Sequence, residues 1–409
     1  MDVVMLYNIL EDEADEELLL LANHFRNEND EMFSQRSREG CFSTLIQRRL
    51  IDNETRFRAY FRVSFELFNY ILNVIIEDIR RRPSNRIKKP ISPEEKLSVT
   101  LRFLATGESY KSLAFQFRIS HSWISTIIRE VLVAICHRLK NIAIPEPTQC
   151  SLSKVANDFY EMWNFPNSCG AIDGKHIRIV CPDNSGSLFF NYKSFFSIVL
   201  LALVDANNKF LVVDIGSYGK EGDAEIFPKS NLGKSISTGE FKFPEPKCLP
   251  NTDVVLPQVF VGDEAFKLTE TMMRPYPRNQ SKLNPKKAIS NYRLDRARRT
   301  TENTFGIMCQ YFRVFFTPIN ILPDTVDNLI MAACIIHNLL REERMVCPMD
   351  STDRDPITDV QTNTNMIQFG AVGGNATHEA FRVRETFKDY FNSRSGSVSW
   401  QQKHVTRTN

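Results

Sequence analysis

The sequence predicts an α/β protein in which a mixed β-sheet flanked by helices follows an all-α region containing a helix-turn-helix. Three patterns support this fold class. Apolar residues recur at helical spacing before residue 140, and continuous apolar runs typical of buried strands follow Cys169. Helical spacing then returns after residue 288. Strands followed by helices in this order are typical of a sheet covered by helices.

Composition limits the class of protein further. The chain has 409 residues, enough for two or three domains, and 30 phenylalanines can supply a sizeable core. The net charge of +2 gives no global sign of nucleic-acid binding, so local patches matter more. Nine cysteines without a C-x-x-C pair disfavour a zinc ribbon or a disulfide framework and favour a reducing compartment.

The sequence shows no signal peptide and no transmembrane segment. The N-terminus is acidic from Glu11 to Glu17, unlike a signal peptide. Apolar runs such as Ile198–Val204 are far too short to span a bilayer. We therefore expect a soluble intracellular protein without membrane association.

The N-terminal part is expected to contain a poorly ordered or helical segment over residues 1–55 and a helical region over residues 56–145. Phenylalanines and isoleucines recur at spacings of three and four between Arg56 and Arg82, which predicts an amphipathic helix. The run Arg80–Lys89 then carries six basic residues in ten. Such a run binds phosphate, directs nuclear import or is a solvated linker, and the sequence favours none of these over the others.

A helix-turn-helix is predicted within residues 91–140. A helix beginning near Ser92, a short helix over Tyr110–Phe117 and a long helix capped by Ser120 give its order. The third helix of such a motif enters the DNA major groove by its N-terminal residues, although three-helix bundles that bind nothing are also common. The residues expected to contact DNA here are Lys111, Arg118, His121, Trp123 and Arg129.

Residues 146–345 are expected to form the sheet domain. A strand over Cys169–Val180 is followed by a hairpin of strands over Ser197–Asp205 and Phe210–Gly216. Another strand is predicted over Val254–Asp263. Further elements are a short helix near Phe159–Trp163, helices over Ala288–Phe315 and Val326–Glu343, a mobile polar segment over 346–378 and a helix over 379–391.

Three acids are distributed over these elements in a way that suggests a metal site. Asp173 lies inside the first strand, Asp263 ends a later strand, and Glu302 lies on the helix that follows. If the two strands are neighbours, the three carboxylates converge and repel one another unless cations intervene. Mg²⁺ or Mn²⁺ would suit oxygen ligands, and two ions ~3.5–4 Å apart activate the attacking and leaving oxygens of a phosphodiester. Asp173 would bridge both ions, and Asp263 and Glu302 would hold one each.

Each acid also has an ordinary explanation. Asp173 would accept backbone N–H bonds, Asp263 would cap a turn or helix, and Glu302 would pair with Arg298 one turn back. A basic run over Arg274–Arg299 is either a solvated face or a contact with the DNA backbone, and its position beside a phosphodiester site favours DNA. The candidate contacts in this run are Lys286, Lys287, Arg293, Arg296 and Arg299.

The acid-bearing segments resemble a known family. Ala171–His176, Val261–Phe266 and Thr301–Gly306 resemble the three acid motifs of the PIF/Harbinger-type DDE transposases and of the domesticated nuclease-like proteins derived from them. The resemblance extends over roughly residues 60–391. Further segments that resemble the family are Leu101–Gly107, Ile119–Ser125, Cys334–Asn338 and Phe387–Phe391.

The resemblance implies a ribonuclease H-like fold, divalent-metal cleavage and joining of DNA strands, and a Myb-like DNA-binding partner that aids nuclear entry. A nuclear location, with a cytoplasmic pool when the partner is absent, and a homodimer are further expectations. Asp223, His176 and Lys175 are candidates for a supporting role around the metals. Lys175 stands where the family usually has a small residue, so it either tunes the site or marks relaxed selection. A catalytically silent DNA-binding or chromatin adaptor is the alternative to an active nuclease.

Overall fold

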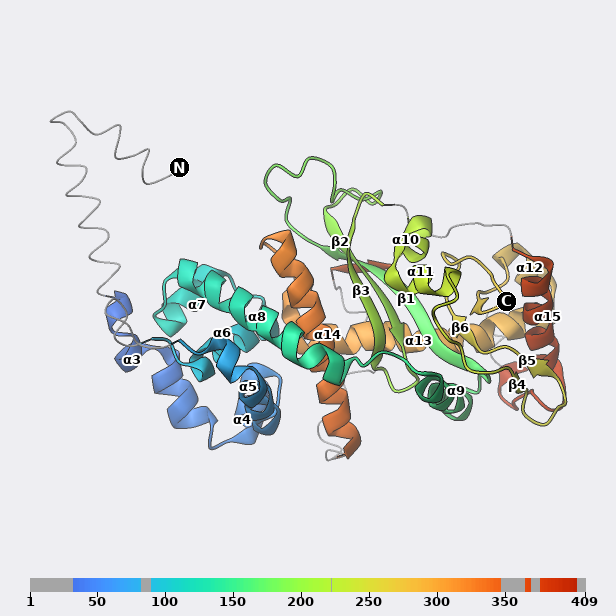
Figure 1. Cartoon of the computed structure of the whole chain (residues 1–409), viewed down its shortest axis with the longest axis horizontal. Helices are drawn as coiled ribbons and strands as arrows, with labels where there is room; N and C mark the ends of the chain where they lie inside the picture. Colours follow the sequence, from blue (N-terminus) through green and yellow to red (C-terminus); the bar gives the residue numbers. More distant parts are fainter. Residues whose placement is uncertain (1–31, 82–89, 222, 347–364, 369–375, 403–409) are drawn as a thin grey trace. The chain divides into compact units, whose positions relative to one another are not determined.

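The computed structural model describes residues 32–81, 90–221, 223–346, 365–368 and 376–402 (Figure 1). The chain divides into two compact units. The smaller unit comprises Met1–Leu72, Ile79–Phe103 and Glu108–Val131, and the larger one comprises Asn73–Asp78, Leu104–Gly107 and Leu132–Asn409. Each unit is built around its own packed interior.

The smaller unit is helical. Its helices are α3 (Arg36–Glu39), the π-helix η2 (Phe42–Leu50), α4 (Glu54–Phe61), α5 (Phe65–Ile79), α6 (Pro93–Thr106), α7 (Tyr110–Phe117) and the N-terminal part of α8 (His121–Ala143). The single helix predicted over residues 56–82 is therefore wrong, because the chain breaks between α4 and α5. Arg62 ends α4 in a left-handed conformation with φ of 64°, and the Ser64 hydroxyl accepts the Leu67 N–H at 2.9 Å to begin α5.

Apolar side chains and one buried cation hold this unit together. Phe57 packs on Phe61 and Phe68 with ring centroids 4.7 and 5.5 Å apart. Lys96 is buried, and its Nζ donates to the Ile79 carbonyl at 2.6 Å and to a Glu130 carboxylate oxygen at 2.9 Å. These two acceptors offset the desolvation of the ammonium group.

The larger unit contains a mixed β-sheet with the order β3-β2-β1-β6-β7. Antiparallel pairs join β1 to β2 and β2 to β3, and parallel pairs join β1 to β6 and β6 to β7. A short strand, β8, pairs antiparallel with β1. The bounds are β1 Ser168–Arg178, β2 Ser197–Val204, β3 Phe210–Tyr218, β6 Val259–Val261, β7 Met272–Met273 and β8 Met366–Gln368, and a separate sheet holds β4 (Lys247–Cys248) and β5 (Val255–Leu256).

Strand β1 has different partners along one edge. Its residues Ser168 and Ala171 pair with β6, whereas its residues 175–177 pair with β8. Residues 172–174 lie between these two pairings while β2 continues along the opposite edge. Asp173 is the middle residue of this interval, so an acidic side chain enters the sheet where one edge of the ladder is interrupted.

Helices cover both faces of the sheet (Figure 1). On one face, Ile172 and Leu203 pack in a core that also includes Leu152 of α9, Ile226 of α10 and Leu232 of α11. On the other face lie α13 and α14. The helices of this unit are α9 (Gln149–Trp163), α10 (Asp223–Lys229), α11 (Asn231–Ser237), α12 (Arg278–Leu283), α13 (Pro285–Tyr311), the 3₁₀ helix η3 (Arg313–Phe316), α14 (Pro323–Val346) and α15 (His378–Asn392).

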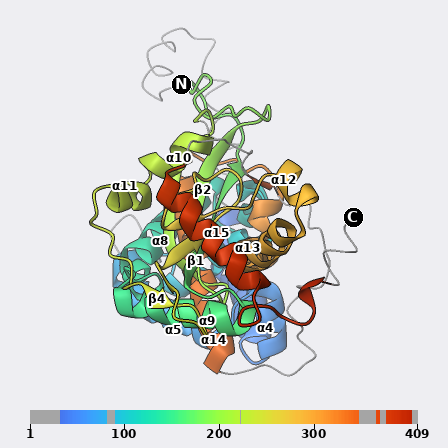
Figure 2. The same cartoon turned by 90° about the vertical axis from the view of Figure 1, so that its right-hand side faces the viewer.

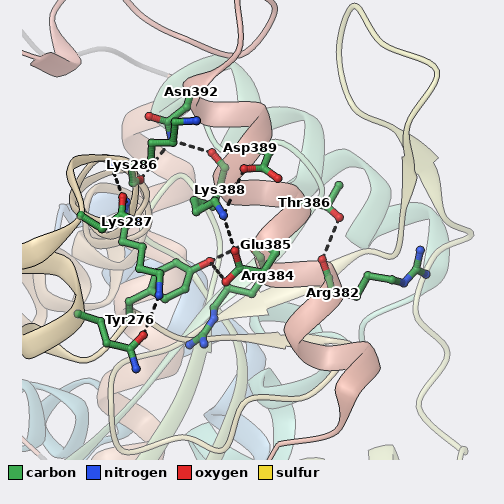
Figure 3. A network of polar contacts seen from close by, with 12 residues as sticks. Tyr276, Lys286, Lys287, Arg382, Arg384, Glu385, Thr386, Lys388, Asp389 and Asn392 are labelled. Carbon is green, nitrogen blue, oxygen red and sulfur yellow. Dashed lines mark hydrogen bonds and ion pairs between the residues drawn. The ribbon is translucent and has the colours of Figure 1, made fainter.

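The C-terminal helix α15 lies along α13 (Figure 2). The Tyr276 hydroxyl, just before α12, donates to the Glu385 carboxylate at 3.0 Å (Figure 3). At the C-terminal end of α15, the Asn392 side-chain amide donates to the Lys286 carbonyl at 3.2 Å (Figure 3). These contacts fix α15 against the N-terminal part of α13.

Several element predictions need correction. The helix α9 runs over fifteen residues, where only a short helix near Phe159–Trp163 was predicted. The strand predicted over Val254–Asp263 is two strands, β5 and β6, separated by Pro257 and Gln258. Strand β8 lies within the segment predicted to be mobile; the remainder of that prediction over 347–364 and 369–375, and of the N-terminal prediction over 1–31, lies outside the described residues.

Helix α14 is tied to the β2–β3 hairpin by polar side chains. Asn338 accepts the Phe210 N–H and donates to the Phe210 carbonyl, both at 2.8 Å. His337 Nε2 lies 2.7 Å from the Asn208 carbonyl oxygen, consistent with its role as a core histidine. Among the described residues no single helix is long and apolar enough to cross a membrane; α7 and α8 meet that test of length and composition as a bent pair.

Candidate functional site

Asp173 lies in β1, and Asp263 follows the end of β6, the parallel neighbour of β1. Ala171 of β1 pairs with Val261 of β6. Asp173 and Asp263 each follow these partners by two residues. Side chains alternate between faces, and neighbouring strands lie about 4.7–4.9 Å apart, so this register directs both acids to the face opposite the Ile172 core. That face is the one covered by α13.

Asp173 is fully buried and meets a lysine. Its Oδ1 accepts the Gly174 N–H at 2.8 Å. Its Oδ2 accepts no hydrogen bond from any described residue, but the Lys175 Nζ lies 3.0 Å away, at an unfavourable angle for a hydrogen bond. The Lys175 side chain is 9% exposed and its Nζ lies 5.5 Å from the centroid of the Phe305 ring on α13. The pair is therefore a buried ion pair beneath α13.

Asp263 forms a turn at the end of β6. Its Oδ1 accepts the Ala265 N–H at 2.9 Å, and its carbonyl lies 3.4 Å from the Phe266 nitrogen. A side-chain acceptor two residues before the donor is the Asx turn that aspartate favours at strand ends. Asp263 therefore caps a turn, which is the alternative role that the sequence allowed for this acid.

Glu302 pairs with Arg298 one turn earlier on α13, with 2.8 Å between Arg298 Nη2 and the carboxylate. Arg298 also interacts electrostatically with Asp173 and Asp295. Burial disfavours the charged form of Arg298, but Glu302, Asp173 and Asp295 together raise its pKa above the ordinary value. Arg298 is therefore the group that links the acid on the helix to the acid in the strand.

Asp295 completes the charged group on this part of α13. Burial raises the pKa of Asp295, Arg298 opposes that shift, and Glu302 and Glu264 add to it. Glu264 follows Asp263 directly, so the helix segment from Asp295 to Glu302 lies near the end of β6. The charged groups of α13 from Asp295 to Glu302 therefore lie within electrostatic range of both Asp173 and the residue that follows Asp263.

The acids suit a divalent metal by chemical type but are paired with protein cations. All three offer oxygen donors, and Asp173 Oδ2 is a buried acceptor without a hydrogen bond. In the part of the chain that the structure describes, however, no three His, Cys, Asp or Glu side chains are grouped so as to hold one ion. Lys175 and Arg298 neutralise Asp173 and Glu302 instead.

Of the predicted supporting residues, His176 points to the face opposite Asp173. His176 is buried on the Ile172 side of β1, where its Nδ1 lies 3.0 Å from the Ser197 hydroxyl. Asp223 begins α10, which packs on that same side, and its side chain lies outside the described residues. Of the three supporting candidates, Lys175 is the one that contacts a predicted acid.

The predicted DNA-contact residues of the smaller unit lie around the junction of α7 and α8. These helices meet at 101° and are joined by Arg118, Ile119 and Ser120. Arg118 ends α7 with a left-handed φ of 55° and lies 3.6 Å from the Glu39 carboxylate. Trp123 is 40% exposed beneath the Arg81 guanidinium, and the remaining candidates, Lys111, His121 and Arg129, are exposed.

The structure contradicts the predicted contact of Arg293 with DNA. It was predicted to contact DNA, but its side chain is fully buried and donates to the Gly396 carbonyl at 2.9 Å and the Gln401 side chain at 3.0 Å. A third donor bonds the Asn164 carbonyl. Burial lowers the pKa of Arg293 to about 10. Arg293 therefore ties α13 to the C-terminal segment instead of facing solvent.

The other basic residues of α13 differ in exposure. Lys286 and Arg299 are exposed, whereas Lys287 lies 5.0 Å from the Tyr276 ring centroid. Arg296 lies 4.6 Å from the Trp400 ring centroid. The basic run is thus partly a packing surface.

The sequence predicted that Arg298 pairs with Glu302 but did not predict its interaction with Asp173, because helical spacing relates only residues of the same helix.

A known protein family matches the part of the chain that contains Asp173, Asp263 and Glu302. Residues 172–338 match the family described as the DDE superfamily endonucleases. The chain is therefore similar to that superfamily over these residues, which make up less than half of its length.

Three similar proteins align with about 70% of the chain. It is 25% identical over 292 residues to an Arabidopsis thaliana protein named ALP1-like, covering 69% of this chain and 70% of the relative. It is 24% identical over 296 residues to the Arabidopsis thaliana antagonist of like heterochromatin protein 1, covering 71% and 74%. It is 23% identical over 285 residues to the human protein named "Putative nuclease HARBI1", covering 68% and 75%. No solved structure matches the chain.

Proposed function

We propose that this protein is a divalent-metal-dependent DNA endonuclease in which Asp173, Asp263 and Glu302 are the catalytic acids. The reaction is phosphodiester cleavage by water, with strand transfer following when a DNA hydroxyl replaces the water. A ribonuclease H-like arrangement of the mixed sheet is part of the proposal. The match of residues 172–338 to an endonuclease family supports the nuclease class, and the reaction and the acids are our inference.

One observation carries the proposal. Asp173 and Asp263 follow paired residues of two parallel strands by the same number of positions, on the face that α13 covers. Arg298 then connects Glu302 electrostatically to Asp173. Acids from three distant segments thus share one face of the sheet. Lys175 and Arg298 offset the charges of Asp173 and Glu302, and bound divalent ions would take over that role in the active protein.

Mg²⁺ or Mn²⁺, two ions in all, would be held by these three carboxylates. Bound divalent ions lower the pKa of the attacking water and stabilise the leaving oxygen. The protein's own contribution is to hold Asp173 in a central strand, where the Gly174 N–H donates to its Oδ1. Lys286 and Arg299, exposed on α13, would contact DNA phosphates.

The helices α7 and α8 would form a DNA-binding helix-turn-helix. Their 101° angle and three-residue connection fall within the range of that motif. The exposed residues at the beginning of α8, His121 and Trp123, would then approach base edges, and Lys111 and Arg129 would contact phosphates.

The test is a nicking assay on supercoiled DNA with the full chain in Mg²⁺ or Mn²⁺. Changes around a metal's direct ligands cost about 10–100-fold, so Asp173→Asn and Glu302→Gln should each lower the rate by at least about 100-fold. The control is Asp214→Asn. Asp214 is an acid of the same sheet whose Oδ2 accepts the Asn231 N–H at 2.6 Å, away from the proposed site. Wild-type rates in Asp173→Asn would show that Asp173 is not catalytic.

A second candidate function is a non-enzymatic DNA-binding or chromatin adaptor. The ion pair between Lys175 and Asp173 favours it, since a protein cation already neutralises the central acid. One relative is named as an antagonist of like heterochromatin protein 1. An adaptor would bind DNA with the same affinity in wild type and in Asp173→Asn and would nick none of the substrates tested. A Myb-like partner, a homodimer and a nuclear location belong to both proposals, and co-purification with tagged full chain from nuclei would test them.

A further inference from the structure

The strongest unexplained contact in the larger unit is the buried pair of Asp173 and Lys175. Both residues lie on β1, two positions apart, so their side chains share the face beneath α13. Asp173 is 0% exposed and the Lys175 side chain is 9% exposed. The Lys175 Nζ is 3.0 Å from the Asp173 oxygen that accepts no hydrogen bond from the described residues.

The surroundings of this pair make the ammonium a fixed part of the site. Its Nζ lies 5.5 Å from the Phe305 ring centroid, and it interacts electrostatically with the buried Cys309. The charged groups that face Asp173 are Lys175 from β1 and Arg298 from α13, and Glu302 is held by Arg298. Two protein cations therefore surround the acids that the proposed function assigns to metal binding.

We propose that Lys175 competes with divalent metal for Asp173 and so sets the metal concentration at which the site binds an ion. This inference rests on the proposed function. An ammonium 3.0 Å from Oδ2 stands at the oxygen that a metal would use, and two cations at one oxygen repel strongly in a buried site. For a metal to bind, the Lys175 ammonium must move away on its flexible four-carbon stem. Lys175 is thus a residue that determines metal affinity without binding the metal.

The experiment measures Mn²⁺ binding to the full chain by electron paramagnetic resonance and calorimetry, without DNA and at about pH 8, well above ordinary carboxyl pKa values. Lys175→Met keeps the length of the stem and removes the charge. We expect it to bind Mn²⁺ at least about tenfold more tightly than wild type, the lower end of the change produced by residues around metal ligands. Lys175→Arg, which keeps the charge, should remain near the wild-type affinity.

Thermal unfolding provides a second readout. Without metal, Lys175→Met should melt below wild type because Asp173 loses its buried partner. Added Mn²⁺ should restore most of this loss in the variant and raise the melting temperature of wild type much less. Lys175→Gln also removes the charge, and it provides the same comparison if the Met variant folds poorly.

Lys96→Met is the matched control for the loss of a buried lysine. Lys96 also forms a buried ion pair, 2.9 Å from Glu130, but in the smaller unit. Its replacement should lower stability and leave Mn²⁺ affinity unchanged. If Lys175→Met and Lys175→Gln bind Mn²⁺ no more tightly than wild type while Asp173→Asn weakens binding, the competition is wrong and the metal site stands. If Asp173→Asn binds Mn²⁺ as wild type does, the proposed metal site itself fails.

Discussion

Single buried acids in this protein are neutralised in different ways. Asp173 pairs with Lys175, whereas Asp205, at the end of the β2–β3 hairpin, accepts the backbone N–H groups of Asn207 and Lys209, each at 2.8 Å. Burial raises the pKa of Asp205 to about 6 in spite of those two bonds. The turn therefore holds a carboxyl group that resists ionisation until near-neutral pH.

Asp205 should make stability depend on pH. Its folded-state pKa of about 6 exceeds the ordinary value of 3.8, so the unfolded chain ionises first as pH rises. The stability that the protonated carboxyl contributes is complete below pH 3.8 and is lost as pH rises through about 6. At about 1.4 kcal/mol per pKa unit, the loss amounts to about 2–3 kcal/mol. Asp205→Asn keeps the acceptor oxygen and should flatten this part of the pH profile in chemical denaturation. A profile equally steep in both proteins would assign the dependence to other groups.

Arg293 and Arg299 allow a matched test of the basic run on α13. Arg293→Met leaves the Gly396, Gln401 and Asn164 oxygens without their donor and should cost about 1–3 kcal/mol for each buried acceptor that stays unsatisfied. Arg299→Met, on the exposed side, should change stability by less than about 0.5 kcal/mol. Denaturant midpoints measure both. Equal stability in the two variants would contradict the structural role of Arg293.

These residues also show the limit of sequence reasoning. Composition placed nine basic residues near α13 but did not distinguish the buried Arg293 from the exposed Arg299. The burial of Arg293 depends on Gln401 and Gly396, more than a hundred residues later in the chain. Only the packing of the C-terminal segment determines which arginines remain in solvent.

At the scale of elements, local signals were the reliable ones. The capping residues and apolar spacing predicted α6, α7 and α8, since those signals act within a few residues. The break between β5 and β6 at Pro257 was missed, although proline is unfavourable within a ladder. The prediction that Asp173 and Asp263 converge depended on β1 and β6 being neighbours, and no local sequence pattern determines the order of strands in a sheet.

Helices α7 and α8 should contribute to DNA binding through exposed basic residues. Lys111 and Arg129 are exposed, whereas Arg118 is engaged in ending α7 and in pairing with Glu39. The double variant Lys111→Gln, Arg129→Gln should weaken DNA binding and reduce the slope of log affinity against log salt by about 2, or about 1 for each phosphate contact. Fluorescence anisotropy over a salt series measures the slope. An unchanged slope would mean that the three-helix arrangement is a packing module.

At the scale of the whole molecule, the long-range pairings were the hardest to predict. Strand β8 pairs with β1 across about two hundred residues of sequence, and its three residues lie within a polar segment. Its pairing with residues 175–177 bounds the interval that contains Asp173. The position of the acid in the sheet therefore depends on the distant C-terminal part of the chain as well as on β1 itself.

The C-terminal helix should be required for the stability of the larger unit. Helix α15 buries Phe387, Tyr390 and Phe391 against the unit that holds α13, and each buried aromatic side chain is worth about 3–5 kcal/mol on removal. A chain ending at residue 376 should therefore lose more than about 5 kcal/mol and unfold at a markedly lower temperature. Calorimetry of the shortened chain measures this loss.

A milder change separates the polar contacts of α15 from its apolar ones. Tyr276→Phe removes the hydroxyl that bonds Glu385 and leaves the ring beneath Lys287 (Figure 3). It should cost about 1–2 kcal/mol, the range for a hydrogen bond to a charged group. A chain ending at residue 402, which keeps all of α15, should unfold like the full chain. If the chain ending at 376 is as stable as that control, α13 holds its position over the acids without α15, and the C-terminal segment has no part in shaping the site.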